Sequence, residues 1–284
     1  ILEQEVRKLG FGSPTNIDLP NEYAGTIPSK ALKQRLADIG ALSKESGSAY
    51  YVGDQVLFAI GQGLLSATPI QVAVAYGVLG NEGKVMQPHV VHAIVAPGTP
   101  DIRPGIANLD FLGIADASQI VERFDDELPT STIEIGEDRL DPIVRGLTRV
   151  IRGPGVNYQG YHKTTGELLF RGYPYAELPI AGKTGTAQGL GNLPWNDSSA
   201  FGAFSLSPRP EYRYAAFAYL EKAGYGSQAA APVVKCLYMA LAGKYRFDPI
   251  VVADPLNTNV GTAAPPSYMR NPSCLVGGRS DSRD

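Results

Sequence analysis

The residues best suited to chemistry in this sequence form one short run, Ala181-Gly182-Lys183-Thr184-Gly185-Thr186-Ala187-Gln188. Side chains alternate between the two faces of a strand, so Thr184 and Thr186 would point to one face, as a shared ligand requires. Gly185 would lie between them on the opposite face, where the lack of a side chain lets the strand pack closely against the domain. Lys183 adds a positive charge next to the two hydroxyls.

A phosphate-binding loop is one alternative for this run, because Gly182-Lys183-Thr184 matches the last three positions of that motif. The full motif requires glycine at position 177, where this sequence has Glu177, and it would place Pro179 inside the loop. A carboxylate at the loop entrance would oppose the charge of a phosphate. The other alternative is a strand without chemistry, since threonine is common in strands and a lone Lys-Thr-Gly triplet often occurs by chance.

Three predicted strands and a helix contain or follow the Lys-Thr-Gly run. Leu178–Gln188, Ala200–Ser205 and Tyr212–Leu220 are strand-like, and turn-forming residues at 207–210 join the last two. A helix is predicted over Pro232–Ala242, with proline at its start and glycine after its end. The consecutive strands predict an antiparallel sheet.

Helical patterns dominate the sequence before these strands. Ile1–Leu9, Ser29–Ile39 and Asp141–Ile151 are predicted helices, the last with one buried face. Pro97–Asp138 is rich in proline, glycine and acidic residues, which indicates a long excursion over the surface, and Val90–Val95 is strand-like. Helices followed by antiparallel strands and a final helix predict the α+β class, with helices packed on an antiparallel sheet.

The clearest single helix is predicted over Thr68–Leu79. Thr68 is a good N-cap, Pro69 suits the first helical position, and Gln71 completes a capping box. Gly80 would end the helix. A helix that is apolar all round and too short to span a membrane is expected to be buried at the centre of the domain.

Four segments, in the same order as in class B penicillin-binding proteins, resemble that family over nearly all of Ile1–Gly243. The four segments are Gly10–Glu22, Ile60–Gly63, Thr68–Gln71 and Ala181–Gln188. The family usually has glycine where this sequence has Asn16, a residue that tolerates positive φ better than most. The resemblance implies a penicillin-binding or serine β-lactamase-like transpeptidase fold over residues 1–248, incomplete at its N-terminus. Residues 249–284 form a polar tail that we expect to be disordered.

The resemblance implies a penicillin-binding D,D-transpeptidase that cross-links peptidoglycan stem peptides. In such enzymes a serine attacks the D-Ala-D-Ala amide, and a covalent acyl-enzyme forms. By resemblance, Lys183 supplies positive potential and assists proton movement, while the hydroxyls of Thr184 and Thr186 bind the terminal carboxylate of the substrate. Gly185 belongs to the same substrate-binding strand, and the backbone N–H of Thr186 forms half of an oxyanion hole. No metal ion or organic cofactor is implied.

The nucleophile of such an enzyme does not occur in this sequence. No serine is followed by lysine three positions later, and no serine is followed by asparagine two positions later. In the family, both motifs precede the segment that opens this sequence, so we expect them upstream of Ile1. The chain alone is then expected to be inactive. The alternatives are a D,D-carboxypeptidase or β-lactamase-type hydrolase, and a non-catalytic scaffold or binding module of the cell wall.

The charge of the sequence argues against a nucleic-acid surface. Its net charge is −3 over 284 residues, and lysine and arginine do not cluster. No run approaches the roughly 20 apolar residues that span a bilayer, so we expect any membrane anchor outside this sequence. The resemblance implies a catalytic domain on the outer side of the cytoplasmic membrane. Its implied ligands are peptidoglycan stem peptides and β-lactams, and its implied partner is a membrane glycosyltransferase of wall synthesis.

A few further residues are open to a functional or a structural interpretation. Trp195 could line a cleft or anchor its loop, whereas Gln62 is better explained by a tight turn with its flanking glycines. Tyr173, in a segment rich in glycine and proline, is more typical of packing than of substrate binding. Cys236 lies in a predicted helix and Cys274 in the polar tail, and two free thiols are favoured over a disulfide.

Overall fold

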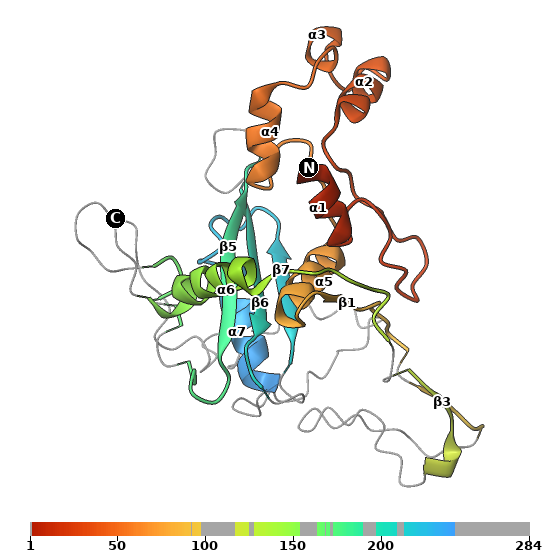
Figure 1. The fold of residues 1–284 in the computed structure, drawn as a ribbon, viewed down its shortest axis with the longest axis vertical. Coiled ribbons are helices and arrows are strands. Elements are labelled where there is room, and N and C mark those ends of the chain that lie inside the picture. The colour runs from red at the N-terminus through yellow and green to blue at the C-terminus, as the bar shows by residue number, and fades with distance from the viewer. Residues whose placement is uncertain are drawn as a thin grey trace, which may run out of the picture.

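A three-stranded antiparallel sheet forms the centre of the structure (Figure 1). In sheet order its strands are β5 (Ile180–Ala187), β6 (Ser198–Ser205) and β7 (Ala215–Leu220), which confirms the predicted sheet. Among the described strands, β7 pairs with β6 alone. The computed structural model describes residues 2–91, 93–97, 117–124, 128–153, 164–167, 169–170, 173–189, 197–208 and 213–241.

The central strand β6 is buried on both faces because a helix packs against each of them. Phe201 and Ala203 point to one face, and Gly202 and Phe204 point to the other, as strand alternation requires. Phe201 and Phe204 are both fully buried. Burying a side chain of this size stabilises the fold by about 1.5–3 kcal/mol.

Helix α7 (Ala230–Leu241) covers the sheet face that carries Phe201 and Ala203. Its Tyr238 is completely buried, and the hydroxyl donates to the carbonyls of Ala203 at 3.1 Å and Tyr214 at 2.8 Å. Burial raises the pKa of Tyr238, so the phenol remains a neutral donor. One side chain thereby joins the helix to the central strand and to the segment that leads into β7.

Helix α5 (Pro69–Gly80) covers the opposite face. Its Tyr76 lies against Gly202, where a Cβ would overlap the tyrosine ring, so only glycine allows this close approach. The Tyr76 ring also packs on Phe204, with ring centroids 6.4 Å apart. Burial raises the pKa of Tyr76 to about 12.

The start of α5 is as predicted, but its end and its burial differ. Thr68 and Gln71 form the predicted capping box. The helix continues through Gly80 to a C-cap at Asn81 with φ −117°, so no left-handed glycine ends it. Only Gln71, Ala75 and Val78 of this helix are buried, so the expected burial on all sides is wrong.

Five further α-helices are found in the described part of the chain. They are α1 (Leu2–Lys8), α2 (Lys30–Asp38), α3 (Lys44–Gly47), α4 (Val52–Ala59) and α6 (Glu137–Arg152). α2, α3 and α4 form a group beyond one end of the sheet, while α6 lies against β5 (Figure 1). α6 begins four residues before the predicted start at Asp141, so Pro142 lies inside it.

The described residues also form two short antiparallel strand pairs, one next to α5 and one that projects away from the main sheet (Figure 1). β1 (Lys84–Val85) pairs with β4 (Ser131–Thr132), and β2 (Ala93–Val95) pairs with β3 (Ile120–Arg123). The described parts of the stretch 97–138 therefore return to pair with earlier strands, and the prediction of a plain surface excursion is incomplete. The strand predicted over Val90–Val95 is shorter than expected.

Some predictions fall on residues outside the described ranges, among them those on Trp195, Cys274 and the tail 249–284. Cys236 on α7 is disulfide-bonded, so the expected free thiol is wrong. Within the described ranges, no helix combines the length and the hydropathy needed to cross a membrane.

Candidate active site

The Lys-Thr-Gly run lies in β5 at the point where this edge strand leaves the core. Ile180 and Ala181 are completely buried. At Gly182 a Cβ would lie only 3.0 Å from the ring of Phe201, which fixes the strand tightly against β6. Lys183 is exposed. The first half of the strand therefore anchors it, and the second half presents polar groups at the surface.

The two threonines share one face of the sheet, as strand alternation predicts. Thr184 lies opposite Phe201 and Thr186 opposite Ser199, and both threonines are half-buried. The Thr184 Oγ1 donates to Thr165 Oγ1 at 3.2 Å. The two hydroxyls can therefore approach one ligand from neighbouring positions on the strand.

The side chain of Lys183 leaves the strand on the opposite face, and its ammonium turns back to the edge of β5. Its Nζ donates to the carbonyl of Thr184 at 2.8 Å. In an edge strand, alternate residues direct both backbone groups away from the neighbouring strand. Both of these carbonyls accept from a side chain: that of Thr184 from Lys183, and that of Thr186, two residues further on, from Gln62. The Lys183 ammonium and the backbone carbonyls of Thr184 and Thr186 thus lie at the edge of β5 with which no described strand pairs.

Gln62 reaches the same edge from a distant part of the chain. Its Nε2 donates to the carbonyl of Thr186 at 2.9 Å, across 124 residues of sequence. The glutamine sits in the turn that follows α4, and α4 stands beyond the end of β5 (Figure 1). Gly61 and Gly63 both have φ of 75°, which confirms the predicted tight turn. The contact with β5 was not predicted, because a turn motif gives no indication of what its side chain touches.

The backbone of Gly185 is held from the sheet face that α7 covers. A Cβ at Gly226 would overlap the Gly185 carbonyl, so the two backbones are in close contact. The fully buried Ser199 hydroxyl donates to the carbonyl of Tyr225 and accepts from the N–H of Ala230, both at 2.9 Å. These bonds fix the turn that carries Gly226. The contact between Gly226 and Gly185 lies on the face of Thr184 and Thr186. On the opposite face, where close packing against the domain was expected, a Cβ at Gly185 would meet only Ala200 of the neighbouring strand, at 3.3 Å.

The aromatic residues before β5 belong to the core. Tyr173 is buried, its ring centroid lies 5.1 Å from that of Tyr175, and the guanidinium of Arg152 lies 5.6 Å from the Tyr175 ring. Burial raises the pKa of both tyrosines. Their role is packing in the core, whereas the sequence predicted packing on the surface.

The phosphate-loop alternative does not fit the structure. Gly182, Lys183 and Thr184 pair continuously with β6, within a strand that extends from Ile180 to Ala187. A phosphate loop needs successive backbone N–H groups that converge on one anion, and a paired strand cannot provide them.

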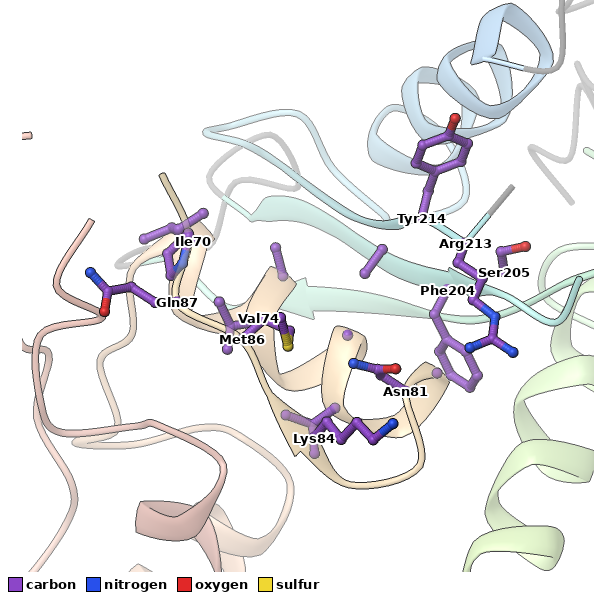
Figure 2. Close-up of a pocket in the computed structure, with 16 residues that line it drawn as sticks. Ile70, Val74, Asn81, Lys84, Met86, Gln87, Phe204, Ser205, Arg213 and Tyr214 are labelled. Carbon is purple, nitrogen blue, oxygen red and sulfur yellow. The ribbon is translucent and has the colours of Figure 1, made fainter. Parts of the chain in front are cut away.

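The hollow shown in Figure 2 is separate from the Lys-Thr-Gly run. It has a volume of about 340 Å³ and lies between α5 and the ends of β6 and β7 that are far from α4. Apolar side chains such as Ile70, Val74 and Phe204 line it, together with Lys84 and Arg213. None of the residues 183–186 contributes to its lining.

Comparisons with known proteins agree with the resemblance seen in the sequence. The sequence model of the family described as penicillin binding protein transpeptidase domain matches residues 2–238. The peptidoglycan D,D-transpeptidase MrdA of Haemophilus influenzae is 29% identical over 246 residues, which are 82% of this chain and 31% of the relative. MrdA of Salmonella typhimurium is 41% identical over 90 residues, 32% of this chain and 13% of the relative. The chain thus spans less than a third of the length of either relative.

A solved structure gives the same fold. The crystal structure of Pseudomonas aeruginosa PBP2 in complex with WCK 5153 superposes with a TM-score of 0.56 at 25% sequence identity. The superposition covers 84% of this chain and 42% of that chain. The predicted α+β class, with helices on an antiparallel sheet, is confirmed by the structure and by this likeness.

Proposed function

The chain belongs to the penicillin-binding protein transpeptidase domain family, and from this premise we propose that it forms part of a peptidoglycan D,D-transpeptidase. The observation that carries the proposal is that the Lys183 ammonium bonds the outward-facing carbonyl of Thr184, while the side chains of Thr184 and Thr186 share one face of β5. An exposed cation and two hydroxyls on one strand segment are suited to the free carboxylate of a peptide that ends in D-Ala-D-Ala.

The proposed reaction proceeds through a serine acyl-enzyme. The serine Oγ attacks the carbonyl of the D-Ala-D-Ala amide, the C–N bond breaks, and the terminal D-alanine leaves as an amine. An amine of a second stem peptide then attacks the ester and releases the serine. Lys183 supplies positive potential and assists proton movement, Thr184 and Thr186 bind the substrate carboxylate, and Gly185 allows the substrate to lie along the strand. The N–H of Thr186 donates to the oxyanion. A donor of this kind lowers the activation barrier by about 2.7–4 kcal/mol.

The nucleophile has to come from outside the given sequence. Since no serine in it has the Ser-x-x-Lys spacing, we assign the nucleophile and its lysine base to an upstream part of the same protein. Because peptidoglycan is cross-linked outside the cytoplasmic membrane, the proposed reaction places the catalytic domain on the outer side of this membrane, where an anchor would hold it. Cross-linking requires newly polymerised glycan, so a membrane glycosyltransferase is the partner that this activity needs. β-Lactams, which mimic the substrate, are expected as acylating inhibitors.

The experiment uses the longer natural protein that contains this chain and the upstream serine. It should be labelled by fluorescent penicillin, and Lys183→Ala should reduce the acylation rate at least a hundredfold. The exposed lysine is not part of the core, so the melting temperature should stay unchanged. A well-folded wild-type protein that resists labelling would disprove the proposed activity, and unchanged acylation of the variant would remove Lys183 from the mechanism.

A hydrolase and a scaffold are the two competing functions. Supplying an amine acceptor with a stem-peptide substrate separates cross-linking from hydrolysis, because a D,D-carboxypeptidase or β-lactamase yields only the hydrolysed product. A scaffold without catalysis would show neither product and no penicillin adduct.

A further inference from the structure

One hydrogen bond joins the turn after α4 to the strand that carries the proposed oxyanion donor. Gln62 Nε2 donates to the Thr186 carbonyl at 2.9 Å. In a strand, the N–H and the carbonyl of one residue point to the same side. A side chain that holds the Thr186 carbonyl at the free edge therefore also sets where the Thr186 N–H points.

The turn that carries Gln62 is itself held firmly. The backbone N–H of Gln62 donates to the carbonyl of Leu57 at 2.8 Å, and that of Gly61 donates to Phe58 at 3.0 Å. At Gly63, which has positive φ, a Cβ would lie 3.2 Å from the Cβ of Leu57, so the turn is packed against its own helix. The glutamine thus projects from a rigid support.

The chain after the turn is tied down as well. Thr26 and Ser66 exchange two backbone hydrogen bonds of 2.8 and 3.0 Å, and the Thr26 hydroxyl donates to the carbonyl of Leu64 at 2.8 Å. Both ends of the turn are therefore fixed, one by α4 and the other by this bridge. An amide on such a support can define the position of a strand that it touches.

The Gly185–Thr186 segment is also held from its opposite side. The backbone of Gly226 touches that of Gly185, and the buried Ser199 hydroxyl fixes the turn around Gly226. The Gly185–Thr186 segment is therefore held between this turn and Gln62. Loss of either support would let the strand end move relative to the rest of the site.

We propose that Gln62 is a positioning residue, which holds the Thr186 backbone so that its N–H faces the reacting carbonyl. The inference rests on the proposed transpeptidase function, since it concerns the same oxyanion donor. In this role Gln62 acts through the Thr186 backbone. Its removal should reduce the rate of the covalent step and leave noncovalent binding in place, because a displaced oxyanion donor destabilises the transition state more than it destabilises the ground-state complex.

The test compares Gln62→Glu and Gln62→Ala with wild type in the longer natural protein that contains the serine. Glutamate keeps the shape of glutamine but cannot donate to a carbonyl when ionised. Stopped-flow labelling with fluorescent penicillin separates the dissociation constant of the first complex from the acylation rate constant. Both variants should acylate about tenfold to a hundredfold more slowly, with a dissociation constant within about twofold of wild type.

The matched control is the same pair of changes at Gln55, which is exposed on α4 next to the turn. Gln55→Glu and Gln55→Ala should acylate like wild type. A second readout is the amide exchange of Gly185, whose N–H faces β6, in this chain; it should be faster in Gln62→Ala than in Gln55→Ala. This exchange readout also decides the matter if a Gln62 variant of the longer protein fails to fold.

The outcomes separate the two proposals. A wild-type protein that penicillin does not label contradicts the proposed function. A labelled wild type with Gln62→Glu acylating at the same rate contradicts the positioning role alone. Equal losses in binding and acylation would assign Gln62 to general support of the cleft and would also overturn the inference.

Discussion

Single amide side chains join segments that are far apart in this chain. Gln71 is completely buried, and its Nε2 donates to the carbonyls of Ser13 at 2.8 Å and Ala24 at 2.9 Å. A buried carbonyl left without a donor costs about 1–3 kcal/mol, so both bonds matter to the free energy of unfolding. Such residues hold the N-terminal segment against α5.

Replacing Gln71 by glutamate should destabilise the protein by roughly 2–4 kcal/mol. The carboxylate cannot donate, so two buried carbonyls lose their partners, and an acidic group has to be buried beside them. Thr68→Ala, which removes only the N-cap hydroxyl, should cost about 1 kcal/mol. Urea unfolding followed by circular dichroism measures both. Equal losses in the two variants would contradict the role given to Gln71.

The ion pair between Lys33 and Asp54 gives a second prediction at this scale. Lys33 Nζ lies 2.7 Å from Asp54 Oδ2, and the lysine side chain is only 5% exposed. The bond from Lys33, together with the N–H of Tyr51, lowers the pKa of Asp54. Asp54→Asn leaves the buried ammonium without its counter-ion, which should cost about 3 kcal/mol in unfolding free energy.

The control for Asp54 is Asp141→Asn, since Asp141 pairs with Arg145 at 3.0 Å on an exposed face of α6. Surface pairs of this kind contribute below about 1 kcal/mol. The two variants should therefore differ clearly in denaturant midpoint. If both behave alike, the Lys33–Asp54 pair is no more important than a surface pair.

Among the elements, helices with a capping residue and a clear apolar period could be predicted from the sequence. Thr68 caps α5, as expected, and Ser29, the first residue of the helix predicted over Ser29–Ile39, caps α2. α4 was missed because its apolar residues do not mark a buried face: Val52 is 81% exposed and Val56 is 56% exposed. Hydrophobic periodicity predicts a helix only when the apolar side chains face a core.

In the candidate site, too, local features could be predicted from the sequence and contacts between distant segments could not. The common face of Thr184 and Thr186 followed from the two-residue period of a strand, which is a local property. The contact of Gln62 with Thr186 and that of Gly226 with Gly185 depend on how distant segments pack. No local pattern contains that information, so these supports could be found only in the structure.

For the molecule as a whole, two carboxylates help to hold the N-terminal segment in place. Asp18 accepts from the backbone N–H of Val91 at 2.8 Å and of Val90 at 2.6 Å, and these bonds lower its pKa. Partial burial acts to raise the pKa of Glu22, but the bonds from Thr15 and neighbouring backbone N–H groups outweigh it, so this pKa is lowered too. Both groups therefore favour the folded state while they are ionised.

This arrangement predicts loosening of the N-terminal segment in acid. The ordinary pKa values are 3.8 for Asp18 and 4.5 for Glu22. The stabilisation is fully present above these values and is lost as the pH falls through the lower values of the folded state. Hydrogen exchange of residues 13–24 should accelerate over that range. Asp18→Asn should exchange faster already at neutral pH, and an unchanged rate would contradict the role of this carboxylate.

The outer edge of β7 carries backbone N–H and carbonyl groups that no described strand takes up. A row of such groups is a template on which another chain can add a strand. When the given chain is prepared by itself, copies should associate edge to edge, and the apparent mass in light scattering should rise with concentration. Lysine in place of Tyr219, which is 43% exposed on this strand, should keep the preparation monomeric.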